Sequence, residues 1–374
     1  LKRPASAGPR APSAAEAPAY ADATRGALGG MRAADKGSFT VSSWSIGSDF
    51  AGFQSECAVQ KVLQPRSDLE WIYYQAGPSE EREPLVLFHG TSGTAAAFFY
   101  QVQSLGKKGY RVISAQYPAY STPEEWCKGF DLFLDALKCR AAHLFGAGLG
   151  GYLAQHFAVR HPARVRSLVL CNSFASTHAF ASQAGSLATF CPLMPSPLLR
   201  KVLLDAFPQG AGMELSAKQA VDWVAQQVND LRGTDLASRL SLNCTPSSVP
   251  APSLDQSRVT LLESNGETMV PEELRRQLRG MYPGARVAQL KAGGDFPYLS
   301  RPDEAILFLE VHMRGLGVFA SGRGPEDLAA ELAKAQAEAE DEERKQAAAF
   351  YPAPEAPPAR RQVWKNPFED EPWL

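Results

Sequence analysis

The chain has 374 residues, of which 45% are hydrophobic and 21% charged, a length that fits one large globular domain with tails or two small domains. Lys and Arg number 38 against 40 Asp and Glu, and the resulting net charge of −2 argues against a nucleic-acid-binding protein. The sequence contains no run of about 18 apolar residues, so no transmembrane segment is predicted. The six cysteines stand singly, without metal-ligand spacing, so we expect reduced, buried, intracellular thiols, no metal and no cofactor.

Residues 1–38 are rich in Ala, Pro, Ser and Gly and have few large apolar side chains. Such a segment cannot bury enough surface to offset its chain entropy, so we predict a disordered leader. Its six basic and three acidic residues also fit a transit peptide, although less well. Met31 is an alternative initiator.

Residues 39–320 are predicted to form one domain of alternating strands and helices. Within it, residues 44–75 are expected to supply antiparallel edge strands, and the apolar run 84–90 a buried strand. The alternation continues along the chain, with strands expected at 110–118, 142–148, 164–173, 257–264 and 285–294 and helices at 123–138, 149–162, 271–283 and 301–317. This order predicts an α/β fold with a mostly parallel central sheet and helices on both faces.

A cap and two C-terminal segments depart from this rhythm. The proline-broken helical pieces over about 176–245 predict a helical cap inserted over the carboxyl edge of the sheet. Residues 321–350 are dense in Ala, Glu, Lys and Gln and predict a solvated helix. Residues 351–374 are first Pro-rich and then acidic, and predict a disordered tail.

A short motif in that tail suggests a docking function. Asn366, Pro367 and Phe368, followed by acidic residues, resemble the tripeptide that EH domains of endocytic adaptors bind. An Asn-Pro turn would present the phenylalanine ring to a pocket on the adaptor. Our hypothesis is that the tail docks on such a trafficking adaptor.

The glycine-rich turn GAGLGG at 146–151 lies between a predicted strand and a predicted helix. Proteins of the α/β-hydrolase fold place their G-x-S-x-G motif at such a turn, with the catalytic serine at its centre. The central residue here is Gly148, which has no side chain and therefore supplies no nucleophile.

The two other positions of a hydrolase triad are occupied by carboxylic acids. Glu267 stands where the orienting acid is expected, and Asp295 stands where the histidine of a G-G-H-F turn is expected. Without an imidazole the site has no base with a pKa near neutrality. We therefore predict a vestigial triad of Gly148, Glu267 and Asp295, no catalytic residue, and no enzyme activity.

The loop that follows the strand at 84–90 resembles one that supplies an oxyanion donor. We assign the remnant of this oxyanion site to His89, Gly90, Thr91 and Leu149. A triad without nucleophile and base would retain at best about 10³–10⁴-fold catalysis over water.

Two other functions remain open for this sheet edge, a serine hydrolase with a relocated nucleophile and a dinucleotide-binding site. A serine hydrolase with a nucleophile relocated to Ser92 or Ser173 would need a base, and no histidine is placed for one, since His178 lies apart in the inserted segment. The same glycines also fit G-x-G-x-x-G, but they follow the third strand of the run, which argues against dinucleotide binding. Asp295 is expected to hydrogen-bond within its own turn, and the other histidines to be structural.

A resemblance to the maspardin family is carried by AHLFGAGLGGYLAQHFA, VRSLVLCNSF, DLASRLSLNC, YPGARVAQLKAGGDFPYLSRPDE and SGTAAAFFYQ. It covers roughly residues 44–318 and implies the α/β-hydrolase fold without catalysis. In that family the G-G-H-F turn holds Asn or Asp, as at Asp295, whereas members usually keep a serine where this chain has Gly148.

The resemblance also implies a function. The human member of the family is implicated in binding the cytoplasmic tail of a T-cell co-receptor and in endosomal and trans-Golgi trafficking. By this resemblance the chain is a pseudoenzyme that acts as a protein-binding or trafficking adaptor in the cytosol, with peripheral endosomal or Golgi membrane association. Its partner would be a receptor tail or an endocytic adaptor. The alternative is a small-molecule receptor that uses the vestigial pocket.

Overall fold

The computed structural model describes residues 45–185, 187–208, 212–250, 253–266 and 268–318, together with Ala337. The chain divides into two compact units, 1–321 and 322–374, and every described residue except the helical, exposed Ala337 belongs to the first. Several predictions lie outside the described residues: the leader at 1–38 with Met31, the helix at 321–350 apart from Ala337, the tail at 351–374, and Glu267.

The described part of the first unit is built on an eight-stranded sheet with the order β1-β2-β4-β3-β5-β6-β7-β8. Its strands are β1 (Gln60–Leu63), β2 (Glu70–Ala76), β3 (Leu85–Phe88), β4 (Val112–Gln116), β5 (Ala142–Ala147), β6 (Val165–Cys171), β7 (Val259–Ser264) and β8 (Arg286–Leu290). β2 pairs antiparallel with β1 and β4, and all other neighbouring strands are parallel. The mostly parallel α/β sheet predicted from the sequence is confirmed, although β2 lies inside the sheet and only β1 is an edge strand on that side.

The helices that cover the sheet and form its insertion follow the same order along the chain. The α-helices are α1 (Ile46–Glu56), α2 (Phe99–Lys107), α3 (Pro123–Ala136), α4 (Leu149–Arg160), α5 (His178–Ala184), α6 (Leu187–Phe190), α7 (Ser196–Asp205), α8 (Leu215–Asn229), α9 (Gly233–Cys244), α10 (Glu272–Met281), α11 (Pro297–Ser300) and α12 (Pro302–Gly315). Short 3₁₀ turns span Ala95–Phe98, Pro162–Arg164, Cys191–Leu193 and Gln256–Arg258.

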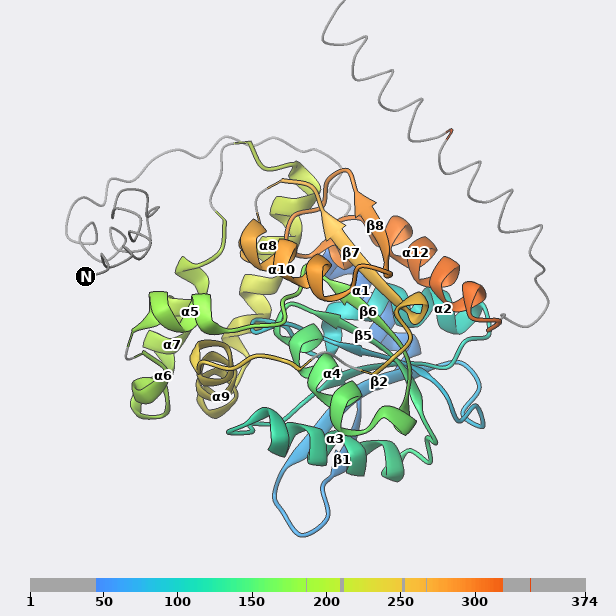
Figure 1. Cartoon of the computed structure of the whole chain (residues 1–374), viewed down its shortest axis with the longest axis horizontal. Helices are drawn as coiled ribbons and strands as arrows, with labels where there is room; N and C mark the ends of the chain where they lie inside the picture. Colours follow the sequence, from blue (N-terminus) through green and yellow to red (C-terminus); the bar gives the residue numbers. More distant parts are fainter. Residues whose placement is uncertain are drawn as a thin grey trace, which may run out of the picture. The chain divides into compact units, whose positions relative to one another are not determined.

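Alternate residues of the central strands pack on opposite faces of the sheet. Val86 and Phe88 of β3 join a core with residues of α3, α4 and α10, whereas Leu85 and Leu87 join a second core with α1, α2 and α12. Figure 1 shows α2 and α12 on one side of the sheet and α3 and α4 on the other. Burial on both faces is why these strands read as continuous apolar runs in the sequence.

The segment before β1 is helical, so the strand predicted there was wrong in part. Ile46, Phe50 and Phe53 recur at helical spacing, and this spacing places them on one face of α1. The Phe53 ring lies 5.1 Å from the Tyr74 ring, and the Phe50 ring lies 5.4 Å from the Phe99 ring, both measured between ring centroids. The aromatic cluster between α1, α2 and β2 favours the helix over an extra edge strand.

Helices α5 to α9 lie between β6 and β7, within the segment expected to form a cap. From α8, Trp223 places its ring 5.6 Å from Phe50 of α1, measured between centroids. From α9, the Ser238 hydroxyl donates to the Tyr120 carbonyl at 2.6 Å, and Arg239 Nη1 donates to the Gly93 carbonyl at 2.7 Å. Aromatic packing and hydrogen bonds thus tie α8 and α9 to the sheet domain.

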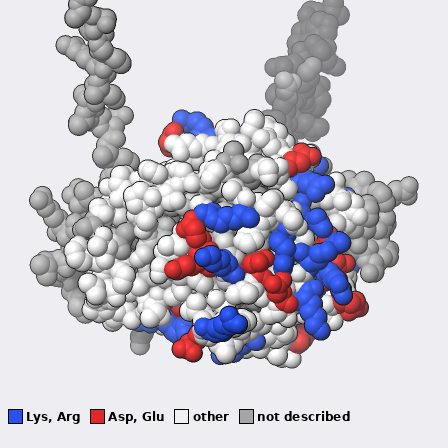
Figure 2. Space-filling model, turned by 60° about the horizontal axis from the view of Figure 1, so that its bottom comes forward, with Lys and Arg blue, Asp and Glu red and all other residues white. Residues whose placement is uncertain are grey.

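Charged side chains on the face shown in Figure 2 are of both signs, and acidic groups lie beside the basic ones. Ion pairs such as Arg164 with Asp135, at 2.9 Å, and Arg166 with Glu83, at 2.7 Å, are of this mixed kind. In the part of the chain that the structure describes, no helix is long and apolar enough to cross a membrane. Nor do the described His, Cys, Asp and Glu residues form a group able to hold a metal ion.

Candidate ligand pocket

A sharp turn joins β5 to α4 at the carboxyl edge of the sheet. Gly148 occupies its apex with φ 49° and ψ −118°, a left-handed backbone conformation that favours glycine. Its N–H donates to the Cys171 carbonyl at 3.0 Å, and its own carbonyl accepts the Ser173 hydroxyl at 2.8 Å. The hydrogen bonds to the last residue of β6 and to Ser173, two residues beyond it, hold the turn in the geometry of a nucleophile elbow.

The glycines of this turn differ in how much room surrounds them. A Cβ on Gly146 would come within 2.4 Å of the Gly151 backbone, so β5 and α4 can approach only because both residues are glycine. At Gly148 the nearest atom to an added Cβ would be 3.9 Å away. The turn therefore has space for a side chain at its centre and carries none.

A cavity of about 360 Å³ lies over this turn. Loop residues at the sheet edge form its floor, and residues of α5, α7 and α9 form much of its wall. The lining is mainly apolar and includes Phe174, Phe180, Leu203, Leu240 and Phe296. Apolar walls with few polar groups are typical of a small-molecule site.

Asp295 reaches this cavity from the loop after β8, and its side chain is only 8% exposed. Its Oδ1 accepts the Met269 N–H at 2.6 Å, whereas its Oδ2 has no hydrogen-bond partner among the described residues. Burial raises the pKa of this carboxyl to about 6, against the opposing effects of the Met269 N–H and the Arg275 charge. The expectation that Asp295 would hydrogen-bond within its own turn was wrong, because its partner lies on the loop after β7.

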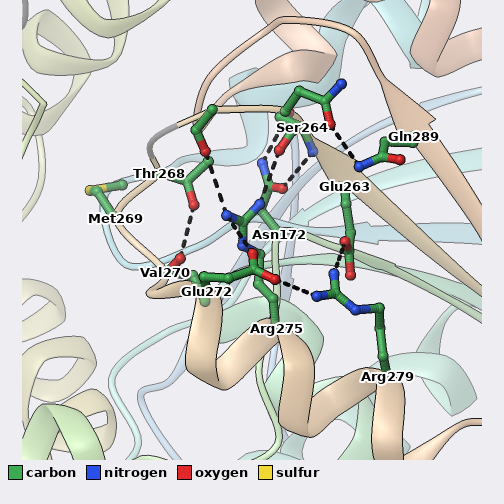
Figure 3. Close-up of polar contacts among 12 residues, drawn as sticks. Asn172, Glu263, Ser264, Thr268, Met269, Val270, Glu272, Arg275, Arg279 and Gln289 are labelled. Carbon is green, nitrogen blue, oxygen red and sulfur yellow. Dashed lines mark hydrogen bonds and ion pairs between the residues drawn. The ribbon is translucent and has the colours of Figure 1, made fainter.

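Asn172, at the end of β6, joins three neighbouring strand ends. Its Oδ1 accepts the Ser264 N–H at 3.0 Å, and its Nδ2 donates to the Gly294 carbonyl at 3.0 Å and to the Ser264 hydroxyl at 3.3 Å. Its φ of 39° is one that asparagine tolerates better than most residues. Figure 3 shows Asn172 directed toward Ser264, beside Arg275.

Arg275 of α10 supports the same loop from below. Its Nη1 donates to the Ser264 carbonyl at 3.0 Å, and its Nη2 lies 2.8 Å from Glu272. Arg279 pairs with Glu263 and Glu272, so the charges along α10 compensate one another, as Figure 3 shows. The network holds the loop that presents Met269 to Asp295.

The loop after β3 lies against the elbow because Phe88 pairs with Gly146 in the parallel ladder. Of the oxyanion remnant assigned from the sequence, Gly90, Thr91 and Leu149 line the cavity, whereas His89 does not. The His89 ring stacks on Tyr117 with centroids 4.6 Å apart, and its Nδ1 lies 2.7 Å from the Gly90 carbonyl oxygen. Burial, with the nearby Arg239 charge, lowers the pKa of His89 well below its ordinary value, so this imidazole is neutral.

The relocated-nucleophile hypothesis finds no histidine among the described residues that line the cavity. The expectation that the site has no base with a pKa near neutrality was wrong, because burial raises the pKa of Asp295 to about 6. Ser92 lines the cavity and Ser173 donates to the Gly148 carbonyl, but the cavity lining includes no histidine. His178 is exposed at the start of α5, with its Nδ1 3.1 Å from the Ser176 hydroxyl. The two serines and His178 are therefore not brought together.

Sequence reasoning missed Asn172, Arg239 and Arg275, which shape the pocket without resembling catalytic residues. A polar residue directly after a buried strand was the available signal for Asn172. The arginines lie in amphipathic helices, and only the tertiary structure shows that Arg239 and Arg275 are buried.

Comparison with known proteins identifies the family. A model described as "Alpha/beta hydrolase family" matches residues 85–307. Maspardin of Danio rerio is 38% identical over 295 residues, covering 78% of this chain and 94% of that protein. Human maspardin is 38% identical over 271 residues, covering 72% and 87%. The chain belongs to the maspardin family of α/β hydrolases.

The fold of this maspardin-family chain resembles those of solved hydrolase structures. A thermophilic esterase from Thermogutta terrifontis superposes with a TM-score of 0.57 at 15% identity, covering 69% of this chain and 98% of that one. A hydrolase from Pseudomonas aeruginosa gives 0.55 at 19% identity, with 70% and 98% covered. At these identities the likeness concerns the fold alone.

Proposed function

We propose that this maspardin-family chain does not hydrolyse esters or amides and works by binding other molecules, proteins first among them. The observation that supports this proposal is Gly148 at the apex of an otherwise intact elbow. A hydrolase of this fold needs an oxygen nucleophile there and an imidazole to activate it. Because Asp295 stands where the imidazole is expected, the second of these requirements is not met.

The absence of hydrolysis can be tested with the full-length protein and p-nitrophenyl butyrate. We expect the same rate from the parent, from Ser92→Ala and from Ser173→Ala, because the Ser173 hydroxyl donates to the Gly148 carbonyl and the cavity lining that includes Ser92 contains no histidine. Steady turnover that disappears in either serine variant would establish a relocated nucleophile and overturn the proposal.

As partners of this protein we propose receptor tails or endocytic adaptors, met in the cytosol and at endosomal or trans-Golgi membranes. Membership of the maspardin family supports this role, and the sequence Asn366-Pro367-Phe368 adds a chemically defined docking peptide. Affinity purification of the full chain beside a chain ending at Gly322 separates partners of the tail from partners of the fold.

The tail hypothesis has a sharper test in a direct binding measurement. We expect a purified EH domain to bind the full chain and to bind Phe368→Ala much more weakly, because the ring fills the domain's pocket. The nearby Trp364→Ala variant is the matched aromatic control. Equal binding of Phe368→Ala and the parent chain would remove this hypothesis.

A small-molecule receptor is the second candidate function. Its support is the cavity of about 360 Å³ over the elbow, which falls within the usual range for ligand sites. In this role the fold would keep the substrate pocket of a hydrolase and use it for binding alone.

A further inference from the structure

The cavity over the elbow is lined by a buried carboxylate oxygen that accepts no hydrogen bond from the described residues. Asp295 is only 8% exposed, and its Oδ2 has no hydrogen-bond partner among the described residues, whereas its Oδ1 is held by Met269. A buried polar atom that loses water without gaining a partner costs free energy. A donor supplied by a bound molecule would recover that cost.

The first turn of α4 borders the same cavity and offers backbone donors. Gly148 precedes the helix without a capping side chain, and Leu149 lines the cavity. The first N–H groups of a helix have no acceptor within it and carry a partial positive charge. The space at Gly148, with 3.9 Å to the nearest atom from an added Cβ, lies in the same lining.

The remaining walls require a mainly apolar molecule, since they include Phe174, Phe180, Leu203 and Phe296. We propose that the cavity binds an apolar molecule bearing a hydroxyl group, which donates to Asp295 and accepts from the N-terminus of α4. This inference deepens the second candidate function and rests on it.

The charge pattern favours a hydroxyl over a charged head group. An ammonium would be attracted to Asp295 but would face the positive end of α4, with Arg275 also close enough to act on that carboxyl. A carboxylate would suit the helix but would face Asp295. A hydroxyl both donates and accepts, and it carries no charge to desolvate.

Calorimetric titration of the full-length protein at neutral pH with matched probes tests the assignment. The probes are 1-octanol, octyl methyl ether, octylamine and octanoate. We expect 1-octanol to bind most tightly, and octyl methyl ether, which accepts but cannot donate, to bind about tenfold to a hundredfold more weakly.

Variants add a second test of the same atoms. Asp295→Asn keeps an oxygen for Met269 and turns the free acceptor into a donor, so its preference for 1-octanol over the ether should disappear. Gly148→Ser fills the vacant space and should weaken binding of 1-octanol. Asp222→Asn, an exposed change outside the lining, is the matched control and should bind as the parent does.

Each other outcome overturns a distinct part of the reasoning. Equal binding of alcohol and ether, unchanged in Asp295→Asn, would leave an apolar receptor and remove the hydroxyl assignment. Tighter binding of octylamine that is lost in Asp295→Asn would establish a cation site instead. Binding by none of the probes would remove both the inference and the receptor function, while the absence of hydrolysis is judged by its own assay.

Discussion

Single residues decide what the carboxyl edge of this sheet can do. Gly148 has the backbone of a nucleophile and no side chain, and Asp295 has a raised pKa of about 6 and one unpartnered oxygen. Both were found from the sequence, because their positions relative to strand ends are local. The direction of the Asp295 side chain was not, because its partner Met269 lies 26 residues away in the chain.

Replacing Asp295 by asparagine should stabilise the protein at neutral pH. Folding raises the pKa of this carboxyl from 3.8 to about 6, so the stability of the parent falls as pH rises through this window. The loss is of the order of 2–3 kcal/mol above pH about 6, and the neutral amide avoids it. Thermal melts should show Asp295→Asn above the parent at pH 7.5, with the difference vanishing near pH 4.

The groups around Asp295 include Arg275, Cys171 and Tyr298, and of these Arg275 is the one charged in this pH range. Asp222→Asn controls for the loss of a negative charge elsewhere on the domain. A lower melting temperature for Asp295→Asn than for the parent at pH 7.5 would contradict the burial argument.

At the scale of elements, the pocket depends on how strand ends and helix starts are joined. The sequence predicted the order of strands, the elbow and the inserted helices, because apolar runs and glycines are local signals. It did not predict α1, whose fate depends on Tyr74, Phe99 and Trp223 from distant elements. Nor did it indicate the hydrogen bonds of Asn172, which join segments 92 and 122 residues apart.

Two glycines of the elbow should respond differently to substitution. Gly146→Ala places a Cβ 2.4 Å from the Gly151 backbone and should cost about 3 kcal/mol, at the upper end for overpacking, because two backbones must separate. Gly148→Ser has space and should cost only about 1–2 kcal/mol, from its positive φ. The urea midpoints of unfolding of the two variants test this order. Equal destabilisation would show that the space around each glycine does not determine the cost of its substitution.

Asn172 should be replaceable by glycine at lower cost than by alanine. Both variants lose the hydrogen bonds to Ser264 and Gly294, about 1–3 kcal/mol, but alanine adds strain at a φ of 39°. Denaturant melts of Asn172→Gly and Asn172→Ala against the parent separate the two contributions. If Asn172→Ala is the more stable variant, the backbone argument fails.

At the scale of the whole molecule, three buried histidines make the stability of the domain depend on pH. Ser167 of β6 lies 2.8 Å from the Nδ1 of His143 and 2.8 Å from the Nε2 of His312, and Thr260 lies 2.8 Å from the Nδ1 of His312. Burial lowers the pKa of His143 to about 4 and that of His312 to about 3. His156 on α4 is likewise lowered to about 4.

As the pH is lowered, this domain should therefore begin to lose stability at a higher pH than it would if only its carboxylates titrated. In the unfolded chain these three imidazoles take up protons near pH 6.5, whereas in the folded protein they stay neutral down to about pH 4. The stability that these three imidazoles contribute is complete above about pH 6.5 and is lost as the pH falls below it, with a slope of up to about 1.4 kcal/mol per pH unit for each group. Melting temperatures between pH 7.5 and 5 measure this slope.

A His312→Gln variant should show a shallower slope, and His178→Gln, which changes an exposed histidine, should not. The same slope in all three proteins would assign the acid sensitivity to other groups.

The inserted helices are held in place by different kinds of side-chain contact. Trp223 of α8 packs against aromatic rings of α1 and α2, and Ser238 and Arg239 of α9 donate hydrogen bonds to loops of the sheet domain. α5 and α7, which share the cavity wall, are also held by side chains, since the Phe180 ring of α5 lies 4.9 Å from the Phe174 ring and Arg200 of α7 donates to the Leu231 carbonyl at 2.9 Å. Because side chains anchor each of the three helices that form the wall, a bound molecule would spend little free energy on ordering the cavity.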